Sequence, residues 1–322
     1  MLPEHIPGAP RPFAYDHVLY DRQFMSCLFR HAVVWLERLG RPVRLLFHNA
    51  LASTDLVLAQ MLVERRPKFA FRCAAFSDAD FELIGVKEVS VMAETFRDIR
   101  PLVLEQVHAG HFTLVEGNVY YLPHCPEYRK ANNQHVVVIH GIEADGRWAV
   151  VDDDAASILC GYTYEEGYLA RFFEHSLNRK LRYYTVDPRL GAADACALVE
   201  PKFRAFVHQH QDSHAFFSQL GAFLQSPFDS PAAKHHLLRD ALALLSGSRQ
   251  CFASYLQLRG TRAPLVEAAV ACARSAGMLK MIMARATLTG ALDAADLLKR
   301  VEQLRGQEVG LLGQLRAEVP GS

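Results

Sequence analysis

The chain has 322 residues, of which 50% are hydrophobic and 22% are charged, and its 35 basic and 35 acidic side chains cancel. This composition is typical of a globular protein with a full-sized core, built as one large domain or two unequal ones. A chain with no net charge and no Lys/Arg-rich run has little electrostatic attraction for nucleic acid or for anionic membranes, so we expect neither as a partner.

The sequence carries no clear targeting or membrane signal. Residues 1–12 contain four prolines and no apolar run, so we expect no signal peptide. The apolar stretch 264–286 is interrupted by Glu267, Arg274 and Lys280, which favours an amphipathic helix over a membrane span. Seven cysteines without a Cys-x-x-Cys pair indicate free thiols and a cytoplasmic location.

The first part of the chain mixes helix and strand signals. A broad apolar pattern predicts a buried helix over Cys27–Leu39, which Ser26 opens and Gly40 ends. Other patterns predict a strand over Val43–His48 and helices over Ser53–Val63, Glu94–His108 (with a break or kink at Pro101) and Tyr164–Ser176.

Strand signals dominate the middle of the chain. Residues rich in β-branched and aromatic side chains predict four strands, Phe112–Tyr121, His135–Ile142, Trp148–Asp152 and Leu181–Val186. The pair Asp145-Gly146 lies between the second and third of them and tolerates positive φ, which predicts a hairpin. We therefore expect an antiparallel sheet.

The strand signal ends at about Pro201, and four long helical patterns follow: Lys202–Gln225, Pro231–Leu258, Pro264–Thr289 and Ala294–Ala317. The stretch 187–197 is the candidate boundary. The sequence thus predicts an α+β fold, with a catalytic domain over residues 1–190 and an all-helical domain over residues 198–322.

Candidate catalytic residues follow from these elements. A cysteine is nucleophilic as its thiolate, and the start of a helix lowers the thiol pKa, which favours Cys27. His135 begins one strand of the predicted hairpin and Asp152 ends the other, so the two side chains are expected to be neighbours. Such a pair can take the thiol proton and fix the histidine tautomer. Taken singly, a cysteine is more often a small buried hydrophobe.

The chain resembles the butirosin biosynthesis protein H family. The resemblance spans roughly Asp21 to Ser176, and beyond it only the helical character matches. It is carried by the Cys-led helix, by Asn118-Val-Tyr-Tyr-Leu-Pro123, by His135-Val-Val-Val-Ile-His-Gly141 and by Trp148-Ala-Val-Val-Asp152. The His-to-Asp hairpin is also similar to that of bacteriocin-processing cysteine peptidases.

The resemblance implies a papain-like cysteine fold in which Cys27, His135 and Asp152 are the catalytic residues. It further implies transfer of an acyl group from a carrier-protein thioester to an amine in natural-product (antibiotic) biosynthesis. The partners would then be an acyl or peptidyl carrier protein, whose phosphopantetheine arm holds the acyl group, and a small-molecule acceptor. The enzyme itself would need no cofactor.

The site departs from the papain-like pattern before the cysteine. The usual oxyanion-hole Gln position is held by Asp21, whereas Gln23 lies four residues before Cys27. Gln23 is the candidate, and the N–H of Cys27 with another side-chain donor is the alternative. Tyr120 and Tyr121 are candidate substrate-wall residues, although packing is their commoner role.

Two other clusters are weaker. His124-Cys125 with His135 and His140 lacks the spacing of a metal site, so we expect no metal. The acidic run Asp152–Asp154 is most often a solvated turn.

The sequence leaves three functions open. The first is acyl transfer through an acyl-Cys27 intermediate to an amine or hydroxyl acceptor. The second is a cysteine peptidase, amidase or thioesterase that uses the same triad with water. The third is a catalytically silent binding protein. The C-terminal helices would shape the acceptor pocket, the carrier-protein surface or a homodimer contact.

Overall fold

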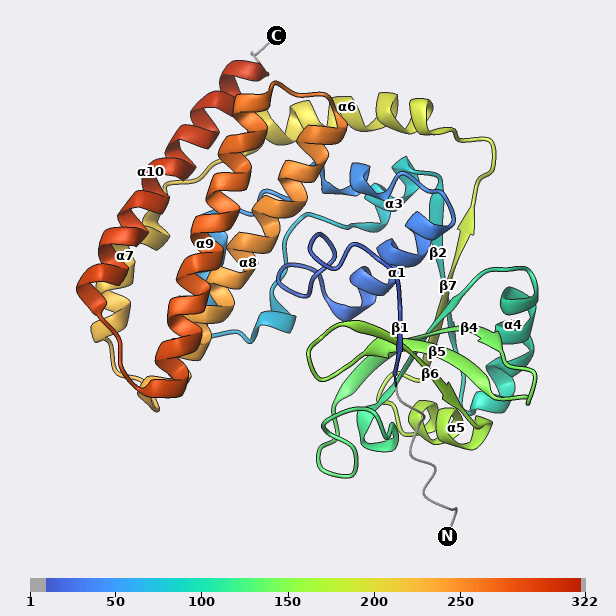
Figure 1. Cartoon of the computed structure of the whole chain (residues 1–322). Coiled ribbons are helices and arrows are strands. Elements are labelled where there is room, and N and C mark those ends of the chain that lie inside the picture. The colour runs from blue at the N-terminus through green and yellow to red at the C-terminus, as the bar shows by residue number, and fades with distance from the viewer. Residues whose placement is uncertain (1–9, 320–322) are drawn as a thin grey trace. The chain divides into compact units, whose positions relative to one another are not determined.

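The computed structural model describes residues 10–319, and the chain divides into two compact units (Figure 1). Within the described residues, the first unit consists of residues 10–41 and 85–189, and the second of residues 42–84 and 190–319. The predicted domains, 1–190 and 198–322, stay a prediction. The compact units differ from them mainly because residues 42–84 belong with the C-terminal helices.

The first unit is built on a seven-stranded antiparallel sheet with the order β1-β6-β5-β4-β3-β7-β2. The strands are β1 Arg11–Pro12, β2 Val86–Met92, β3 Thr113–Asn118, β4 Gln134–Ile142, β5 Trp148–Asp153, β6 Leu159–Tyr164 and β7 Lys180–Val186. The α+β class and the antiparallel sheet are therefore confirmed. The sequence did not predict β1, β2 or β6, because β1 has two residues, β2 alternates with charged residues at the sheet edge and β6 contains a glycine.

Three helices accompany the sheet: α1 Cys27–Arg38, α4 Phe96–His108 and α5 Glu166–Glu174. Helices α4 and α5 share one hydrophobic core with Val137 and Ile139 of β4, and α1 contacts β3 and β4. The helix is not broken at Pro101, since α4 continues through it, and the alternative of a kink there stays a prediction. A capping box between Thr95 and Asp98 stabilises the start of this helix, which offsets the loss of one hydrogen bond at the proline.

The second unit is helical in its described residues. It contains α2 Thr54–Val57, α3 Asp78–Leu83, α6 Ala192–Gln209, α7 Ala215–Gln225, α8 Pro231–Leu258, α9 Ala263–Thr289 and α10 Ala294–Glu318. Short 3₁₀ turns span Val43–Phe47 and Lys68–Ala70, and a π-helical turn spans Leu58–Val63. In the part of the chain that the structure describes, no helix combines the length and the apolar character that crossing a membrane requires.

Two sequence predictions fail in this unit. Val43–His48 is not a strand, because consecutive side chains from Leu45 to Phe47 are all buried, as in a tight turn within a core. The single helix predicted over Lys202–Gln225 is two helices, α6 and α7, and His214 adopts positive φ just before the second.

A buried network around the ion pair of Arg249 and Glu308 links residues 42–84 to the C-terminal helices. Arg249 of α8 donates to both carboxylate oxygens of Glu308 of α10 at 2.8 and 3.1 Å, and also to the carbonyl of Ala52 at 2.7 Å. Ser248 donates to the carbonyl of Ala50 at 2.6 Å. Because a buried charge is costly without partners, this network fixes the segment around Ala52 on the helices.

Gly117 allows α5 to approach the strand that pairs with β4. It lies opposite His135 in the β3–β4 ladder, and a Cβ atom at this position would overlap the buried ring of Phe172. The close approach of α5 to the end of β3 therefore depends on a glycine here.

We expect Gly117→Ala to destabilise the first unit by about 1–3 kcal/mol, because Phe172 has no free space into which to move. Both tryptophans, Trp35 and Trp148, belong to this unit, so urea unfolding followed by their fluorescence measures it selectively. Gly167→Ala in α5 is the control, since its Cβ would meet nothing within 4 Å. Equal midpoints for the two variants would contradict the prediction.

Candidate catalytic site

Cys27 is the first residue of α1 and is partly exposed. The Ser26 side chain caps the helix by accepting a hydrogen bond from the Phe29 N–H at 3.3 Å. The first amides of a helix have no carbonyl partner within it and carry partial positive charge. The sulfur of Cys27 thus lies where a negative charge is favoured.

His135 and Asp152 lie side by side in the β4–β5 hairpin. Val138 pairs with Val151, so the start of β4 lies beside the end of β5. His135 Nε2 is 2.7 Å from Asp152 Oδ1, and the Asp152 side chain is fully buried. This is the proximity that the hairpin pattern predicts. The His135 side chain also forms a hydrogen bond with Cys27, so the three predicted residues are brought together.

The charges of Cys27, His135 and Asp152 stabilise one another. Burial by itself raises the pKa of Cys27, but the hydrogen bond with His135 and the charges of His135 and Arg22 outweigh it, and the pKa lies below its ordinary value. Burial lowers the pKa of His135, yet the adjacent Asp152 charge, their hydrogen bond and Cys27 raise it to about 10. The arrangement therefore favours a thiolate beside an imidazolium.

Asp152 holds a second histidine that sequence reasoning did not select. His124 Nε2 is 2.8 Å from Asp152 Oδ2, and its Nδ1 is 2.5 Å from the hydroxyl of Tyr164. Its ring also stacks on Tyr162 at 4.0 Å between centroids. Burial opposes ionisation of Asp152, but the His135 charge and the hydrogen bonds from both histidines hold its pKa well below the usual range. The carboxylate is thus ionised and fixed at both oxygens.

His31 is a third histidine near this carboxylate. It lies one turn after Cys27 on α1, and its Nε2 is 3.8 Å from Asp152 Oδ1. Neither of its ring nitrogens has a hydrogen-bond partner among residues 10–319. Burial lowers the pKa of His31 to about 3, although the Asp152 charge acts the other way, so the ring is neutral at pH 7. In the sequence, the i, i+4 spacing from Cys27 is the signal that could have identified His31 as a neighbour of this cysteine.

The acidic run is not a solvated turn throughout. Asp152 and Asp153 are buried residues of β5, whereas Asp154 accepts backbone hydrogen bonds in the turn that follows. Asp153 pairs with the buried Arg30 of α1 and, at 2.8 Å, with Arg22. These ion pairs keep positive charge beside the start of α1.

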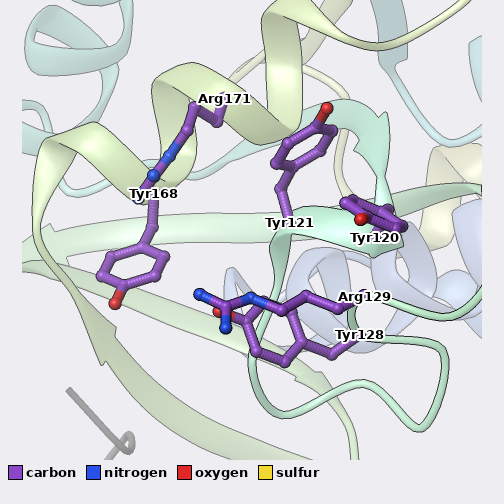
Figure 2. A pocket seen from close by; sticks show the side chains of 6 residues that line it. All are labelled: Tyr120, Tyr121, Tyr128, Arg129, Tyr168 and Arg171. Atoms are coloured by element: carbon purple, nitrogen blue, oxygen red, sulfur yellow. The ribbon is translucent and has the colours of Figure 1, made fainter. Parts of the chain in front are cut away.

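The remaining predicted residues, Gln23, Tyr120 and Tyr121, have other partners in the structure. The Gln23 side-chain amide hydrogen-bonds with the Asp21 carboxylate, so Gln23 is held by the residue that occupies the usual Gln position. Tyr120 and Tyr121 form a 3₁₀ turn after β3 and line a pocket with Tyr128, Arg129, Tyr168 and Arg171 (Figure 2). The catalytic and binding roles of all these residues stay predictions.

Among residues 10–319, two overlapping groups have the ligand types of a metal site: His124, Cys125 and Asp152, and His135, Asp152 and Asp153, with ligand atoms within 4.8 Å. Hydrogen bonds account for this proximity, since each histidine directs Nε2 at an oxygen of Asp152. Burial also raises the pKa of the Cys125 thiol far above its usual range, which disfavours a thiolate ligand. The expectation of a site without metal stays a prediction.

Comparison with known proteins gives one informative result. No protein-family model matches the chain. The curated protein "Ribostamycin:4-(gamma-L-glutamylamino)-(S)-2-hydroxybutanoyl-[BtrI acyl-carrier protein] 4-(gamma-L-glutamylamino)-(S)-2-hydroxybutanoate transferase" of Niallia circulans is 22% identical over 305 residues, which cover 92% of this chain and 97% of that protein. Together with the motifs around Cys27, Tyr120 and His135, this similarity supports the placement of the chain in the butirosin biosynthesis protein H-like family.

Proposed function

We propose that the chain is a papain-like cysteine acyltransferase that moves an acyl group from a carrier-protein thioester to an amine or hydroxyl acceptor through an acyl-Cys27 intermediate. The observation that carries the proposal is the hydrogen-bonded series from Cys27 through His135 to Asp152 at the start of a helix. The full-length similarity to a protein named as a transferase of an acyl-carrier-protein-bound group supports this reaction.

In the first step, the Cys27 thiolate attacks the thioester carbonyl carbon and forms the new S–C bond. The tetrahedral intermediate then breaks its bond to the pantetheine sulfur. The leaving thiolate takes the proton held on His135, so the products are acyl-Cys27, a neutral His135 and the free carrier-protein thiol. Asp152 stays ionised and holds His135 through Nε2, which leaves Nδ1 for the reacting atoms.

In the second step, the acceptor amine or hydroxyl attacks the acyl-Cys27 carbonyl. His135 takes the proton of the attacking group, and the intermediate expels the Cys27 thiolate, which restores the starting ion pair. The N–H of Cys27 is a donor for the oxyanion because it is one of the unpaired first amides of α1. One N–H of the Gln23 amide is engaged by Asp21, and the amide has a second N–H that could serve the oxyanion.

The proposal assigns the other parts as follows. The phosphopantetheine arm belongs to the carrier protein, and this chain supplies no cofactor of its own. The acceptor is a small molecule, and Tyr120 and Tyr121 form part of the donor's surroundings. A cytoplasmic location and a homodimer contact through the helical unit are parts of the same proposal.

The intermediate can be tested by intact-mass analysis. We expect the wild-type chain, incubated with an acyl-carrier protein, to gain one acyl mass that peptide mapping places on Cys27. Cys27→Ala should gain none. Release of free acid at the same rate with and without an amine acceptor would favour the hydrolase alternative. A wild-type chain that gains no adduct from any carrier thioester, or an adduct on Cys27→Ala, would contradict the proposal.

The ion pair makes a separate prediction about pH. The pKa of Cys27 is lowered and that of His135 is raised to about 10, so the thiolate form is present below the pKa of an ordinary thiol. Iodoacetamide alkylation of Cys27 should therefore slow less on acidification below about pH 8 than alkylation of an ordinary thiol, which slows about tenfold per pH unit.

Peptide mass spectrometry measures this rate, with the urea-unfolded chain as the reference for the same cysteine. His135→Ala should lose the low-pH reactivity. A folded wild-type chain whose Cys27 follows the unfolded profile would show that no ion pair forms.

His124 is predicted to be a positioning residue. Removal of its hydrogen bond to the Asp152 carboxylate in His124→Ala should slow acylation of Cys27 about 10- to 100-fold, because a hydrogen bond to a charged group contributes about 1.5–3 kcal/mol. His124→Gln should recover part of the rate, since its amide can donate to Asp152. Stopped-flow release of the carrier thiol gives the rate. Equal acylation rates for His124→Ala and His124→Gln, at equal thermal stability, would rule out the positioning role of His124.

A further inference from the structure

A small pocket in the first unit is lined by four tyrosines and two arginines and by no acidic residue. Tyr168 and Arg171 come from α5, Tyr120 and Tyr121 from the turn after β3, and Tyr128 and Arg129 from the loop before β4 (Figure 2). Its volume is about 130 Å³. This is well below the roughly 300–1,000 Å³ of pockets that enclose a whole drug-sized ligand, so it fits a single chemical group.

Both guanidinium groups are held against aromatic rings. The Cζ atom of Arg129 lies 4.9 Å from the ring centroid of Tyr128, and that of Arg171 lies 5.0 Å from the ring centroid of Tyr168. Arg171 Nε donates to the Gly167 carbonyl at 3.1 Å, and Arg171 has no ion pair within residues 10–319. Its charge is thus oriented without being neutralised by a carboxylate of the chain.

The loop that carries Arg129 is fixed by its own backbone. The Arg129 N–H donates to the Tyr120 carbonyl at 3.1 Å, and the Tyr128 N–H donates to the Cys125 carbonyl at 3.0 Å. Arg129 has a φ of 54°, a strained value for a residue other than glycine. The surrounding structure therefore holds this arginine in a conformation that it would not adopt by preference.

The pocket is close to the candidate catalytic site along the chain. Gly117 pairs with His135, and Tyr120 follows three residues later, at most about 11 Å away for extended chain. The same loop carries His124, which binds Asp152. This short chain distance is our reason for connecting the pocket with a substrate of the candidate catalytic site.

We propose that this pocket binds an oxyanion of the acyl donor, held by the guanidinium groups of Arg129 and Arg171 and the surrounding tyrosines. The proposal rests on the proposed function and names how that site recognises its donor. Arginine forks match the oxygens of phosphate and carboxylate groups, and aromatic walls keep the forks in place. The anion is either the phosphate of the pantetheine arm or a carboxylate on the acyl group.

Calorimetric binding to the Cys27→Ala chain distinguishes these sources with matched probes. One pair is 4′-phosphopantetheine and pantetheine, which differ by the phosphate. The other is succinyl-pantetheine and butanoyl-pantetheine, which differ by the carboxylate. We expect the anionic member of one pair to bind about tenfold or more tightly than its neutral partner, and the pair that shows this identifies the source.

Variants test whether the preference for the anionic probe arises in the pocket. Arg171→Gln and Arg129→Gln, made in the Cys27→Ala background, should reduce it about tenfold, and Arg171→Lys should keep part of it because the charge remains. Arg189→Gln is the control, since Arg189 is 88% exposed and bonds to Asp187 elsewhere in the unit. No preference in either probe pair, or a preference that survives both Gln variants, would overturn the proposal.

Failure of this inference is distinguishable from failure of acyl transfer. Butanoyl-pantetheine carries neither anion, so its adduct on wild-type Cys27 tests the reaction without the pocket. An adduct together with no anion preference would leave the acyltransferase and remove the anion site. An anion preference without any adduct would leave the anion site and remove the acyltransferase.

Discussion

The buried carboxylate of Asp152 determines how the neighbouring side chains of the site are arranged. An ionised group without solvent costs several kcal/mol unless charges and hydrogen bonds compensate it. Here Oδ1 accepts from His135 at 2.7 Å and Oδ2 accepts from His124 at 2.8 Å. The carboxylate in turn fixes which nitrogen of His135 is occupied, and so which nitrogen is left for Cys27. The catalytic geometry that we propose is thus a consequence of satisfying one buried charge.

Negative and positive charges alternate from the Asp152 carboxylate to His135 and then to Cys27. His135 lies between Asp152 and Cys27, so its positive form is stabilised from both sides and its pKa rises to about 10. Arg22 contributes positive charge to Cys27 and also pairs with Asp153 at 2.8 Å. His31, which is buried beside the same groups, stays neutral, because burial lowers its pKa to about 3 and the charges of Arg30 and His135 act in the same direction. His31 therefore adds packing on the α1 side of the site, and the charged pair is formed by Cys27 of α1 and His135 of β4.

The sequence could predict the parts of the site that local rules determine. The Asp145-Gly146 turn brings the start of β4 beside the end of β5, and Ser26 marks the helix start at Cys27. The register shift between Ile139 and Gly141, which puts His135 and Asp152 on the same face, has no such sequence signal. His124 could not be found in this way, because it lies in a loop without periodicity and reaches Asp152 across 28 positions. The same limit applies to the fold: residues 42–84 join the C-terminal helices through contacts such as Arg249 with Ala52, which are 197 positions apart. Patterns of neighbouring residues carry no information on such contacts.

The segment between β3 and β4 joins the two proposed roles. Its first residues, Tyr120 and Tyr121, line the anionic-group pocket, and His124 follows three residues later with Asp152 as its partner. The Arg129 N–H closes this segment by bonding back to the Tyr120 carbonyl. A displacement of the loop would therefore disturb donor binding and the Asp152 carboxylate together. This gives a physical reason why the Tyr-Tyr-Leu-Pro stretch accompanies the Cys, His and Asp segments in the family resemblance: it leads into His124, which supports the Asp152 carboxylate, and it forms one wall of the pocket that we propose for the donor.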